Sequence, residues 1–388
     1  MIPGKYETVM TLRGTLQAFV PNPLPPDWAM PTEIWTHIVT ARESLAELKA
    51  LGALLPNPEL LLRPLQKQEA ISTSIIEGTR VTPQQLMLFE AEQEEGESSH
   101  SKEDEQEVYN SLLCIRYGIQ QLELLPFCNR LLKGMHEILM TGVRGANKKP
   151  GSFRGPSEQV QVGRYAPPPG LYVDHLMSDL ERFCNQLPDQ IDPLVAILMV
   201  HFQFEAIHPF LDGNGRVGRT LLSLMIYKCF AHTSPLLYMS PYFEAHRQEY
   251  YDGLLGVSQQ GDWETWIRFC LNGVTVQARE AIMLSQQIVK AREQCIRSLV
   301  GATKHSLTLI DLLFQFPALT INKTKRVLGV TAPTAKKELE VLVASNIVTK
   351  TKIGARYYYW AKIPLLNHEL ILADFRNSAD VFNDLTAT

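Results

Sequence analysis

The sequence has no long apolar run and no paired cysteine motif, and these two absences narrow the class of protein. No window holds eighteen uninterrupted apolar residues, so we expect no membrane-spanning helix. Residues 1–7 lack a basic segment followed by an apolar core, so we expect no signal peptide. The six cysteines are scattered without a Cys-x-x-Cys pair, which excludes a disulfide or zinc framework and favours a reduced, cytoplasmic protein.

What is present is a chain of 388 residues, 45% hydrophobic and with a net charge of −4, long enough for two or three domains. Apolar residues recur at helical spacing through most of it, so the expected fold class is mainly α. We predict a helical N-terminal domain over 1–105, a helical core over 106–280, a linker helix over 281–303 and a last domain over 304–388.

The stretch from His208 to Arg219, His-Pro-Phe-Leu-Asp-Gly-Asn-Gly-Arg-Val-Gly-Arg, concentrates the chemistry of the chain. Apolar helical patterns precede and follow it, so we expect a tight loop between two helices. Residues Gly213–Gly215 permit positive φ and leave backbone N–H groups uncovered at the positive end of the second helix, which makes an anion site. Arg216 and Arg219 project from one face of that helix, which is unfavourable unless an anion compensates them.

Two further residues of the stretch suit phosphate chemistry. Asp212 supplies a hard oxygen ligand of the kind that Mg²⁺ accepts beside phosphates. His208 precedes a proline, so it lies where the first helix must end, and a neutral imidazole there can take a proton from a hydroxyl. The alternative is an ordinary capped helix, since Asp-Gly-Asn-Gly is also common turn chemistry.

This stretch resembles the signature of the Fic family, His-Pro-Phe-x-Asp/Glu-Gly-Asn-Gly-Arg-x-x-Arg, and it matches at every specified position. Members of that family resemble nucleotidyl transferases that move AMP from ATP to a hydroxyl of a protein. The resemblance implies a Fic helical core in which His208 is the base and Asp212 holds Mg²⁺. It also implies a set of ATP-binding residues at the helix N-terminus: Gly213, Asn214, Gly215, Arg216, Val217, Gly218 and Arg219.

A second motif, Thr-Ser-Ile-Ile-Glu-Gly over Thr73–Gly78, lies at the end of an earlier helix. Glu77 places an anion where the helix dipole disfavours one, which suggests a cationic partner; a solvated surface glutamate is the alternative. The motif resembles the inhibitory Ser/Thr-x-x-x-Glu-Gly/Asn motif of Fic proteins with an N-terminal inhibitory helix. The resemblance implies that Thr73, Glu77 and Gly78 restrain the site and that Glu77 pairs with Arg219.

A short strand is predicted over residues 159–163, which alternate with period two before three prolines. Fic proteins carry a hairpin over the active site at this point. The resemblance implies a flap at Val160, Gln161 and Val162 whose backbone edge pairs with a target peptide. A hairpin that serves only as a connection is the alternative.

Tyr250 and Tyr251 follow on a later helix, where ring faces suit a nucleobase and ordinary packing is the alternative. The resemblance implies that Tyr251 contacts the nucleotide. Residues 261–269 resemble the closing helix of the Fic core, and a separate long helix is predicted over 274–300. The glutamate-rich residues 90–107 are predicted to form a mobile, solvated loop.

The last part of the chain changes character. Helices are predicted over 307–316 and 321–328, and a third over 331–345 with Thr331 as its N-cap. Residues 347–360 contain two β-rich arms around a turn. Three helices followed by a hairpin describe a winged helix-turn-helix, whose third helix lies in the position that contacts DNA.

Charge in this last domain favours a nucleic-acid partner. Residues 301–360 hold seven Lys and two Arg against one Asp and two Glu, whereas the whole chain is acidic. Dimerisation or docking of a target protein is the alternative role. The candidate phosphate contacts are Lys336, Lys337, Lys350, Lys352 and Arg356.

The function we expect is Mg²⁺-dependent transfer of AMP from ATP to a Ser, Thr or Tyr hydroxyl of a protein, including this protein itself. Glu77 would inhibit the transfer, and hydrolytic removal of AMP by the same site would be a second activity. Two alternatives stay open. One is a protein kinase of the Doc branch, whose loop carries Lys where this chain has Gly215, and the other is a nucleotide-sensing DNA-binding regulator. The expected assembly is a homodimer.

Overall fold

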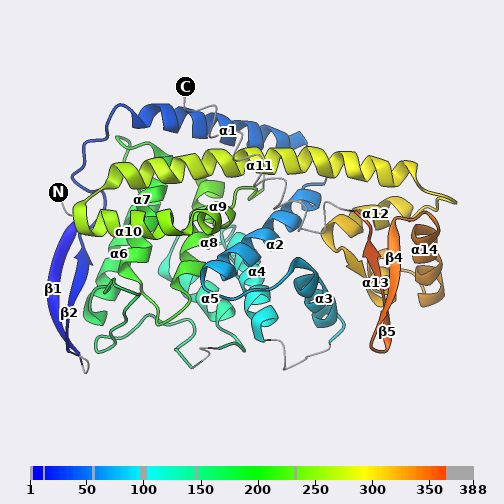
Figure 1. Cartoon of the computed structure of the whole chain (residues 1–388), viewed down its shortest axis with the longest axis horizontal. Coiled ribbons are helices and arrows are strands. Elements are labelled where there is room, and N and C mark those ends of the chain that lie inside the picture. The colour runs from blue at the N-terminus through cyan, green and yellow to red at the C-terminus, as the bar shows by residue number, and fades with distance from the viewer. Residues whose placement is uncertain are drawn as a thin grey trace. The chain divides into compact units, whose positions relative to one another are not determined.

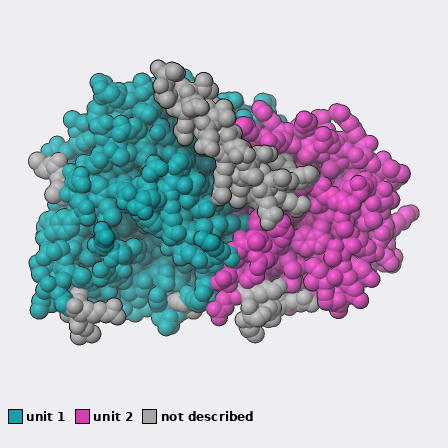
Figure 2. All heavy atoms as spheres, viewed as in Figure 1, with its two compact units in different colours: residues 1–55, 68–80, 106–282 teal, residues 56–67, 81–105, 283–388 magenta. Residues whose placement is uncertain are grey.

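The structure, a computed structural model, describes residues 3–11, 14–54, 57–96, 103–144, 147–230 and 234–363. They form two compact units, which Figure 2 shows in separate colours. Unit 1 holds residues 1–55, 68–80 and 106–282, and unit 2 holds residues 56–67, 81–105 and 283–388. The unit boundaries after residues 105 and 282 lie at or close to those expected after residues 105 and 280. The grouping differs, because residues 56–67 and 81–105 belong to the same unit as the C-terminal part of the chain, and no unit boundary falls at residue 303. Of the predicted last domain, residues 364–388 lie outside the described part of the chain.

Helices dominate the chain, in agreement with the mainly α prediction (Figure 1). Helix α4 (Glu103–Gln121) lies mostly in unit 1, whereas α2 (Glu59–Ile76) and α11 (Trp263–Arg297) each contribute residues to both units. No described helix is apolar over enough of its length to cross a bilayer. The other helices of unit 1 are α1 (Ile34–Leu54), α5 (Asn129–Leu139), α6 (Val173–Asn185), α7 (Pro193–Ile207), α8 (Asn214–Cys229), α9 (Ser240–Ala245) and α10 (Arg247–Gln260).

Helix α7 is the centre of unit 1, and all but two of its residues are buried. Its sequence is apolar on every face, which suits a helix with neighbours on all sides. Pro193 occupies its first turn, and the Asp192 side chain caps it by accepting from the Leu194 N–H at 2.9 Å. Helices α6, α8 and α10 pack against it, so the residue that ends α7 is firmly held.

An N-terminal hairpin, which the sequence analysis did not anticipate, also packs against α7. Strands β1 (Gly4–Thr11) and β2 (Gly14–Pro21) pair antiparallel, with Gly4 opposite Pro21. Phe19 of β2 is fully buried, and its N–H donates to the Ala166 carbonyl at 2.8 Å. The hairpin therefore supports the segment in which the flap was expected.

The strand predicted over residues 159–163 does not form. One antiparallel bridge joins Val162 to Tyr165, through hydrogen bonds of 2.8 and 2.9 Å. The Gln159 side chain donates to the Pro167 carbonyl at 2.9 Å and so takes an acceptor that a strand ladder would use. That proline and the two after it offer no N–H, which stops the ladder from growing.

The two helices expected over 261–269 and 274–300 are one continuous helix, α11. Gly273 lies at the join, where an added Cβ would come 2.6 Å from the Tyr242 ring. A glycine inside a helix costs only about 1 kcal/mol relative to alanine. The buried residues on both sides of this glycine supply the packing that keeps the helix intact.

The glutamate-rich segment is more regular than predicted. Helix α3 (Pro83–Glu94) enters it and α4 begins inside it, while its centre lies outside the described residues. Within unit 2, Glu94 forms an ion pair with Lys323, and Glu95 accepts hydrogen bonds of 2.6 and 2.7 Å. The solvated loop predicted over 90–107 was wrong at these ends, because the carboxylates there are counter-charges and not free surface groups.

The elements predicted for the last domain are present in unit 2. A short strand β3 (Ala318–Leu319) adds to the hairpin, and the sheet order is β3-β5-β4. Thr331 is the N-cap of the third helix, as predicted, and its side chain accepts from the Thr334 N–H. The elements are α12 (Ser306–Gln315), α13 (Ile321–Leu328), α14 (Ala332–Ala344), β4 (Val348–Ile353) and β5 (Arg356–Ala361).

Candidate active site

The loop between α7 and α8 carries the stretch that the sequence analysis singled out. His208 ends α7 in a left-handed conformation with φ of 50°, which is strained for a residue with a side chain. The buried guanidinium of Arg154 holds it there by donating to the carbonyls of His208 at 2.9 Å and Ile207 at 3.1 Å. Its other hydrogen bonds go to the Glu158 and Pro168 carbonyls, so Arg154 ties His208 to the flap segment.

The imidazole of His208 is neutral at physiological pH. Burial lowers its pKa to about 4, the charge of Arg154 acts in the same direction, and Glu77 opposes the shift. The backbone of Glu205 and the charge of Asp212 also oppose the lowering of this pKa. The neutral ring is the form that can accept a proton from a hydroxyl.

The start of α8 is shaped by hydrogen bonds within the loop. Gly213 has φ of 74°, and its N–H donates to Asp212 Oδ1 at 2.7 Å. The Asn214 side chain closes the loop on Phe210, accepting from its N–H at 2.8 Å and donating to its carbonyl at 2.9 Å. The Asn214 side chain is therefore structural. The N–H groups that follow in the first turn have no acceptor within the helix, so they are available to bind an anion.

His136 on α5 supports this loop and was not anticipated from the sequence. Its ring stacks on Phe210 with centroids 3.8 Å apart. Nδ1 accepts a hydrogen bond from the Gly151 N–H, so Nε2 carries the proton and donates to the Asp212 carbonyl at 3.0 Å. Burial lowers the pKa of His136 to about 4, which keeps the ring neutral. A lone histidine in an apolar helical pattern gives no sequence signal for this role.

Asp212 already has a cation beside it. Its Oδ2 pairs with the Lys148 ammonium at 3.0 Å, and both side chains are partly exposed. Burial alone would raise the pKa of Asp212, but Lys148 and the Gly213 N–H hold it below its usual value. No cluster of three or more His, Cys, Asp or Glu that could hold a metal occurs among the described residues. A metal at Asp212 would therefore need phosphate oxygens as further ligands, which is how Mg²⁺ commonly binds.

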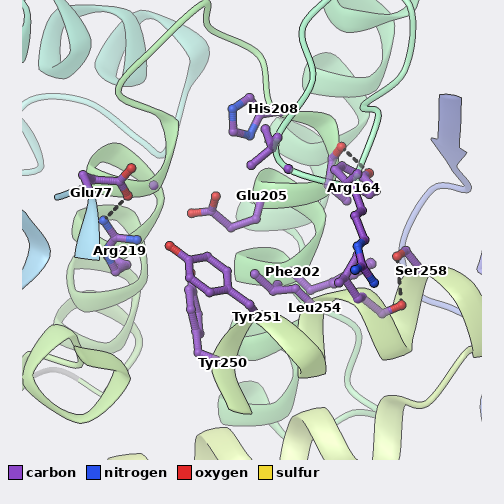
Figure 3. A pocket seen from close by; sticks show the side chains of 16 residues that line it. Glu77, Arg164, Phe202, Glu205, His208, Arg219, Tyr250, Tyr251, Leu254 and Ser258 are labelled. Carbon is purple, nitrogen blue, oxygen red and sulfur yellow. Dashed lines mark hydrogen bonds and ion pairs between the residues drawn. The ribbon is translucent and has the colours of Figure 1, made fainter. Parts of the chain in front are cut away.

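A pocket of about 370 Å³ opens beside the loop, within the size range of small-molecule sites (Figure 3). Glu77 and Arg219 lie on one side of it, and Phe202, Leu254 and Ser258 lie on the other. Of the predicted site residues, those that line the pocket are Glu77, Val162, His208, Gly215, Arg219 and Tyr251. The lining residues that the sequence analysis missed include Phe202, Arg164, Tyr165, Glu205, Leu254, Leu255 and Ser258.

The other predicted residues are not among those that line the pocket. Val217 is fully buried, so its side chain packs in the core of unit 1. Gly218 faces α7, where an added Cβ would come 2.8 Å from the Phe204 ring and would collide with the Glu205 carboxylate. Of the three flap residues, Val160 and Gln161 lie outside the lining.

The guanidinium of Arg219 donates hydrogen bonds to two residues of the second motif, Thr73 and Glu77. Its Nη2 donates to Glu77 Oε1 at 2.7 Å, and this ion pair joins residues 142 positions apart. Its Nε donates to the Thr73 hydroxyl at 2.8 Å, and Nη2 also donates to the Thr73 carbonyl at 3.1 Å. The guanidinium is fully buried, whereas the Glu77 side chain remains 36% exposed toward the pocket.

The charges of this pair stabilise each other. Burial alone would raise the pKa of Glu77, but Arg219, Arg216 and His208 together hold it below its usual value. Burial alone would lower the pKa of Arg219, but Glu77 and other neighbours raise it well above its usual value. Both groups are therefore charged across the working pH range, and separating them would leave a buried cation without its counter-charge.

A second arginine donates a hydrogen bond to a carbonyl at the C-terminus of α2. Gly78 has φ of +99°, and the Thr79 N–H donates back to the Ser74 carbonyl at 2.9 Å, which ends the helix as predicted. Arg247 of α10 donates to the Ile76 carbonyl at 2.6 Å. Two cations thus compensate the negative end of α2, where the sequence had placed only an unfavourable glutamate.

The guanidinium of Arg216 has N–H donors that no described residue accepts. The side chain is buried, and its Nε and Nη1 have no hydrogen-bond partner among the described atoms. Buried unpaired donors on a cation are costly, so an arginine in this state is suited to an incoming anion. Its place in the first turn of α8 agrees with the anion site predicted from the sequence.

The structure distinguishes the two tyrosines of α10. Tyr250 is almost fully buried, and its hydroxyl lies 3.1 Å from His201 Nε2, so it serves packing. Tyr251 is half-buried in the pocket wall, with the Arg247 guanidinium 5.7 Å from the centre of its ring. Both tyrosines line the pocket, and Tyr251, the less buried of the two, is the one more open to a ligand.

Comparison with known proteins agrees with this site. Residues 35–120 match the Fic/DOC family N-terminal domain, and residues 126–226 match the Fic/DOC family domain. The chain is similar to the protein adenylyltransferase Fic of Aedes aegypti, at 33% identity over 120 residues, 31% of this chain and 22% of the relative. It is also similar to the protein adenylyltransferase fic-1 of Caenorhabditis briggsae, at 26% identity over 187 residues, 46% of this chain and 32% of the relative. The chain thus spans between about a fifth and a third of the length of these relatives.

Solved structures share the fold. A Fic family protein from Desulfovibrio desulfuricans superposes with a TM-score of 0.56 and 22% identity, over 87% of this chain and 99% of that one. Fic-1 from C. elegans superposes with a TM-score of 0.51 and 23% identity, over 65% of this chain and 73% of that one. The loop, the pocket and both domain matches agree, and the chain therefore contains the N-terminal and the central domain of the Fic/DOC family.

Proposed function

We propose that this protein transfers AMP from ATP to a Ser, Thr or Tyr hydroxyl of a protein and releases pyrophosphate. The observation that carries the proposal is one pocket that combines a neutral His208, the buried cation of Arg219 and the half-buried ring of Tyr251. These are a proton acceptor, a phosphate ligand and a base-stacking surface. The names of the similar curated proteins, protein adenylyltransferase, support this reaction.

The transfer forms one bond and breaks another at the α-phosphorus. The hydroxyl oxygen of the target attacks, its proton passes to the neutral ring of His208, and the bond to the pyrophosphate oxygen breaks. Arg154 keeps His208 in its strained conformation, so the ring is positioned before substrate arrives.

The phosphates would lie at the start of α8. The N–H groups of Asn214 and Gly215 and the unpaired donors of Arg216 would bind them, and Arg219 would hold the γ-phosphate. Mg²⁺ bound by Asp212 would neutralise charge between phosphates, in the place where Lys148 now compensates the carboxylate.

The flap would hold the target segment. The Val162–Tyr165 bridge fixes a short turn against the pocket, and the exposed Val162 side chain lies at its lip. The Tyr165 hydroxyl donates to the Ala206 carbonyl at 2.7 Å and anchors this turn to α7. An extended peptide could then pair with the backbone at Val160 and Gln161, where it would compete with the hydrogen bond that the Val160 carbonyl accepts from the Gln159 side chain.

Glu77 would inhibit the transfer by occupying Arg219. The γ-phosphate of ATP cannot accept from Nε and Nη2 of this guanidinium while Thr73 and Glu77 hold these two donors. ATP would then bind in a pose that does not expose the α-phosphate to attack. Removal of AMP from the target, with Glu77 positioning a water molecule, is a second activity of the same arrangement.

ATP labelled in different phosphates tests the proposed reaction. Label from the α-phosphate should appear on protein, because AMP is the group transferred. Transfer from the γ-phosphate instead would indicate the kinase of the Doc branch. No transfer from either position, with nucleotide still bound, would indicate a nucleotide sensor and would overturn the proposal.

DNA binding by unit 2 is a second candidate function, favoured by its exposed cations. Lys336 and Lys337 lie exposed on α14, and Lys352 lies exposed on β4. Lys350 and Arg356 are less available, because Lys350 pairs with Glu340 and Arg356 with Glu95. Both lysines of the helix predicted to contact DNA are thus exposed.

If unit 2 binds DNA electrostatically, replacing both Lys336 and Lys337 with alanine should weaken binding to any duplex. Loss of two phosphate contacts should also reduce the dependence of log affinity on log salt by roughly two. Gel-shift titrations over a salt series measure both effects. Lys290→Ala, which removes an exposed lysine of α11, is the control and should change neither. No binding by the wild type even at low salt would remove DNA as a partner and favour a role in dimerisation.

A further inference from the structure

Glu205 lines the pocket, but the reaction proposed above gives it no role. It lies in the last turn of α7, three residues before His208, and its side chain lines the pocket (Figure 3). Its Oε1 is buried and has no hydrogen-bond partner within the described part of the chain. A buried carboxylate oxygen without a donor costs stability unless something else supplies the donor.

The surroundings hold this carboxylate in place without pairing it. Gly218 of α8 lies against Oε1, where any larger residue would collide with it. The nearby cation, Arg219, directs its described hydrogen bonds to Thr73 and Glu77. Burial raises the pKa of Glu205 to about 7, against the influence of Arg219. The protein therefore maintains a costly acid in the pocket, and no partner within the described chain explains it.

The position of Glu205 along the pocket indicates what it would bind. It lies between the Glu77–Arg219 pair, where phosphates would bind, and the apolar side formed by Phe202 and Leu254 (Figure 3). A nucleotide has the order phosphate, sugar, base, so its sugar falls at Glu205. Sugar hydroxyls are neutral hydrogen-bond donors. A carboxylate oxygen without a partner can accept a hydrogen bond from such a hydroxyl, and no counter-charge is needed.

We propose that Glu205 accepts a hydrogen bond from the 2′ or the 3′ hydroxyl of the ribose and thereby makes the site prefer nucleotides that carry that hydroxyl. This inference rests on the proposed function, since it places the nucleotide in the same pocket. Glu205 is then a specificity-determining residue that contacts substrate. Either the 2′ or the 3′ hydroxyl could donate this hydrogen bond, and the experiment distinguishes the two.

The test measures dissociation constants of ATP, 2′-deoxy-ATP and 3′-deoxy-ATP by calorimetry. All proteins carry His208→Ala, so that nucleotide is bound but not consumed. With Glu205 present, ATP should bind roughly 10- to 150-fold more tightly than the analogue that lacks the contacted hydroxyl, as expected for a hydrogen bond to a charged group. Glu205→Ala should bring this ratio close to one, and Glu205→Gln, which keeps an acceptor without the charge, should give an intermediate ratio.

Glu280→Gln is the matched control. Glu280 is another half-buried glutamate of unit 1 whose pKa burial raises to about 7, but it lies outside the pocket lining. It should keep the wild-type preference for ATP. A purely structural role of Glu205 predicts a different pattern, in which Glu205→Ala weakens all three nucleotides equally and leaves the ratio unchanged.

The outcomes separate the inference from the proposed function. If ATP does not bind, the proposed function fails and the inference fails with it. If ATP and both deoxy analogues bind equally tightly, or if Glu205→Ala keeps the preference, only the assignment of Glu205 is overturned. A preference that depends on Glu205 and is unaffected by Glu280→Gln supports it.

Discussion

Replacing His208 with alanine should abolish AMP transfer while ATP binding stays intact. The imidazole acts on the incoming hydroxyl and not on the nucleotide, so the loss belongs to the chemical step. Removing a general base typically costs roughly 10²–10⁴-fold in rate. Labelled transfer to protein measures the rate, and calorimetry measures the binding of ATP.

A surface histidine serves as the control. His175 on α6 is highly exposed and lies 3.4 Å from Asp179 at the surface, so His175→Ala should keep full activity. Transfer by His208→Ala at near wild-type rate would contradict its role as the base. Loss of ATP binding together with transfer would instead point to a folding defect.

The pH dependence of transfer follows from the lowered pKa of His208. Burial brings this pKa to about 4, so the ring is neutral and able to accept a proton at any pH above that value. Activity that depends on the base should therefore be lost as the pH falls through about 4, not through the usual value for histidine near 6.5. A rate that falls by half near pH 6.5 would contradict the burial seen here.

Replacing Glu77 with glycine should activate the enzyme, most visibly as modification of the protein itself. The change would release the buried guanidinium of Arg219 from its ion pair, so that it could bind the γ-phosphate in the productive orientation. A gain of tenfold to a thousandfold corresponds to about 1.4–4 kcal/mol of barrier, a plausible cost for displacing a partly buried ion pair. Labelled-ATP assays on wild type and variant give the ratio directly.

Two companion variants make this test specific. Glu77→Gln keeps the size of the side chain and removes its charge, so it should activate to a smaller degree. Arg219→Ala should inactivate, because the phosphate contact is lost together with the inhibitor. Equal activity of wild type and Glu77→Gly would show that the pair does not inhibit, and lower activity of the variant would make Glu77 a positive contributor, such as a group that positions water.

Prediction from sequence succeeded where local chemistry determines the backbone. His208 before a proline ends a helix, Gly213 begins the next one, and Thr331 caps a helix in the last domain, all as predicted. The strand expected over 159–163 failed for a reason of the same local kind. Period-two alternation was present, but the Gln159 side chain and the following prolines removed the partners that a ladder needs.

Prediction from the sequence was weakest where contacts between residues far apart in the chain decide the local structure. The break expected near residue 273 is absent, because tertiary packing on both sides of Gly273 outweighs the low helix propensity of one glycine. The acidic segment after residue 90 forms ion pairs with Lys323 and other groups of unit 2, which no pattern within the segment could indicate. The N-terminal hairpin was missed although residues 4–21 contain two strand-like halves around Gly14.

The sequence by itself determined the chemistry of the loop from His208 to Arg219, because its residues are contiguous and turn and helix-cap rules act over a few positions. The tertiary structure alone decided how that chemistry is controlled. The pairing of Glu77 with Arg219, the support of His208 by Arg154 and the unpaired carboxylate of Glu205 all depend on packing between separate helices. Burial sets the charge state of each of these groups, and burial exists only once residues far apart in the chain have come together.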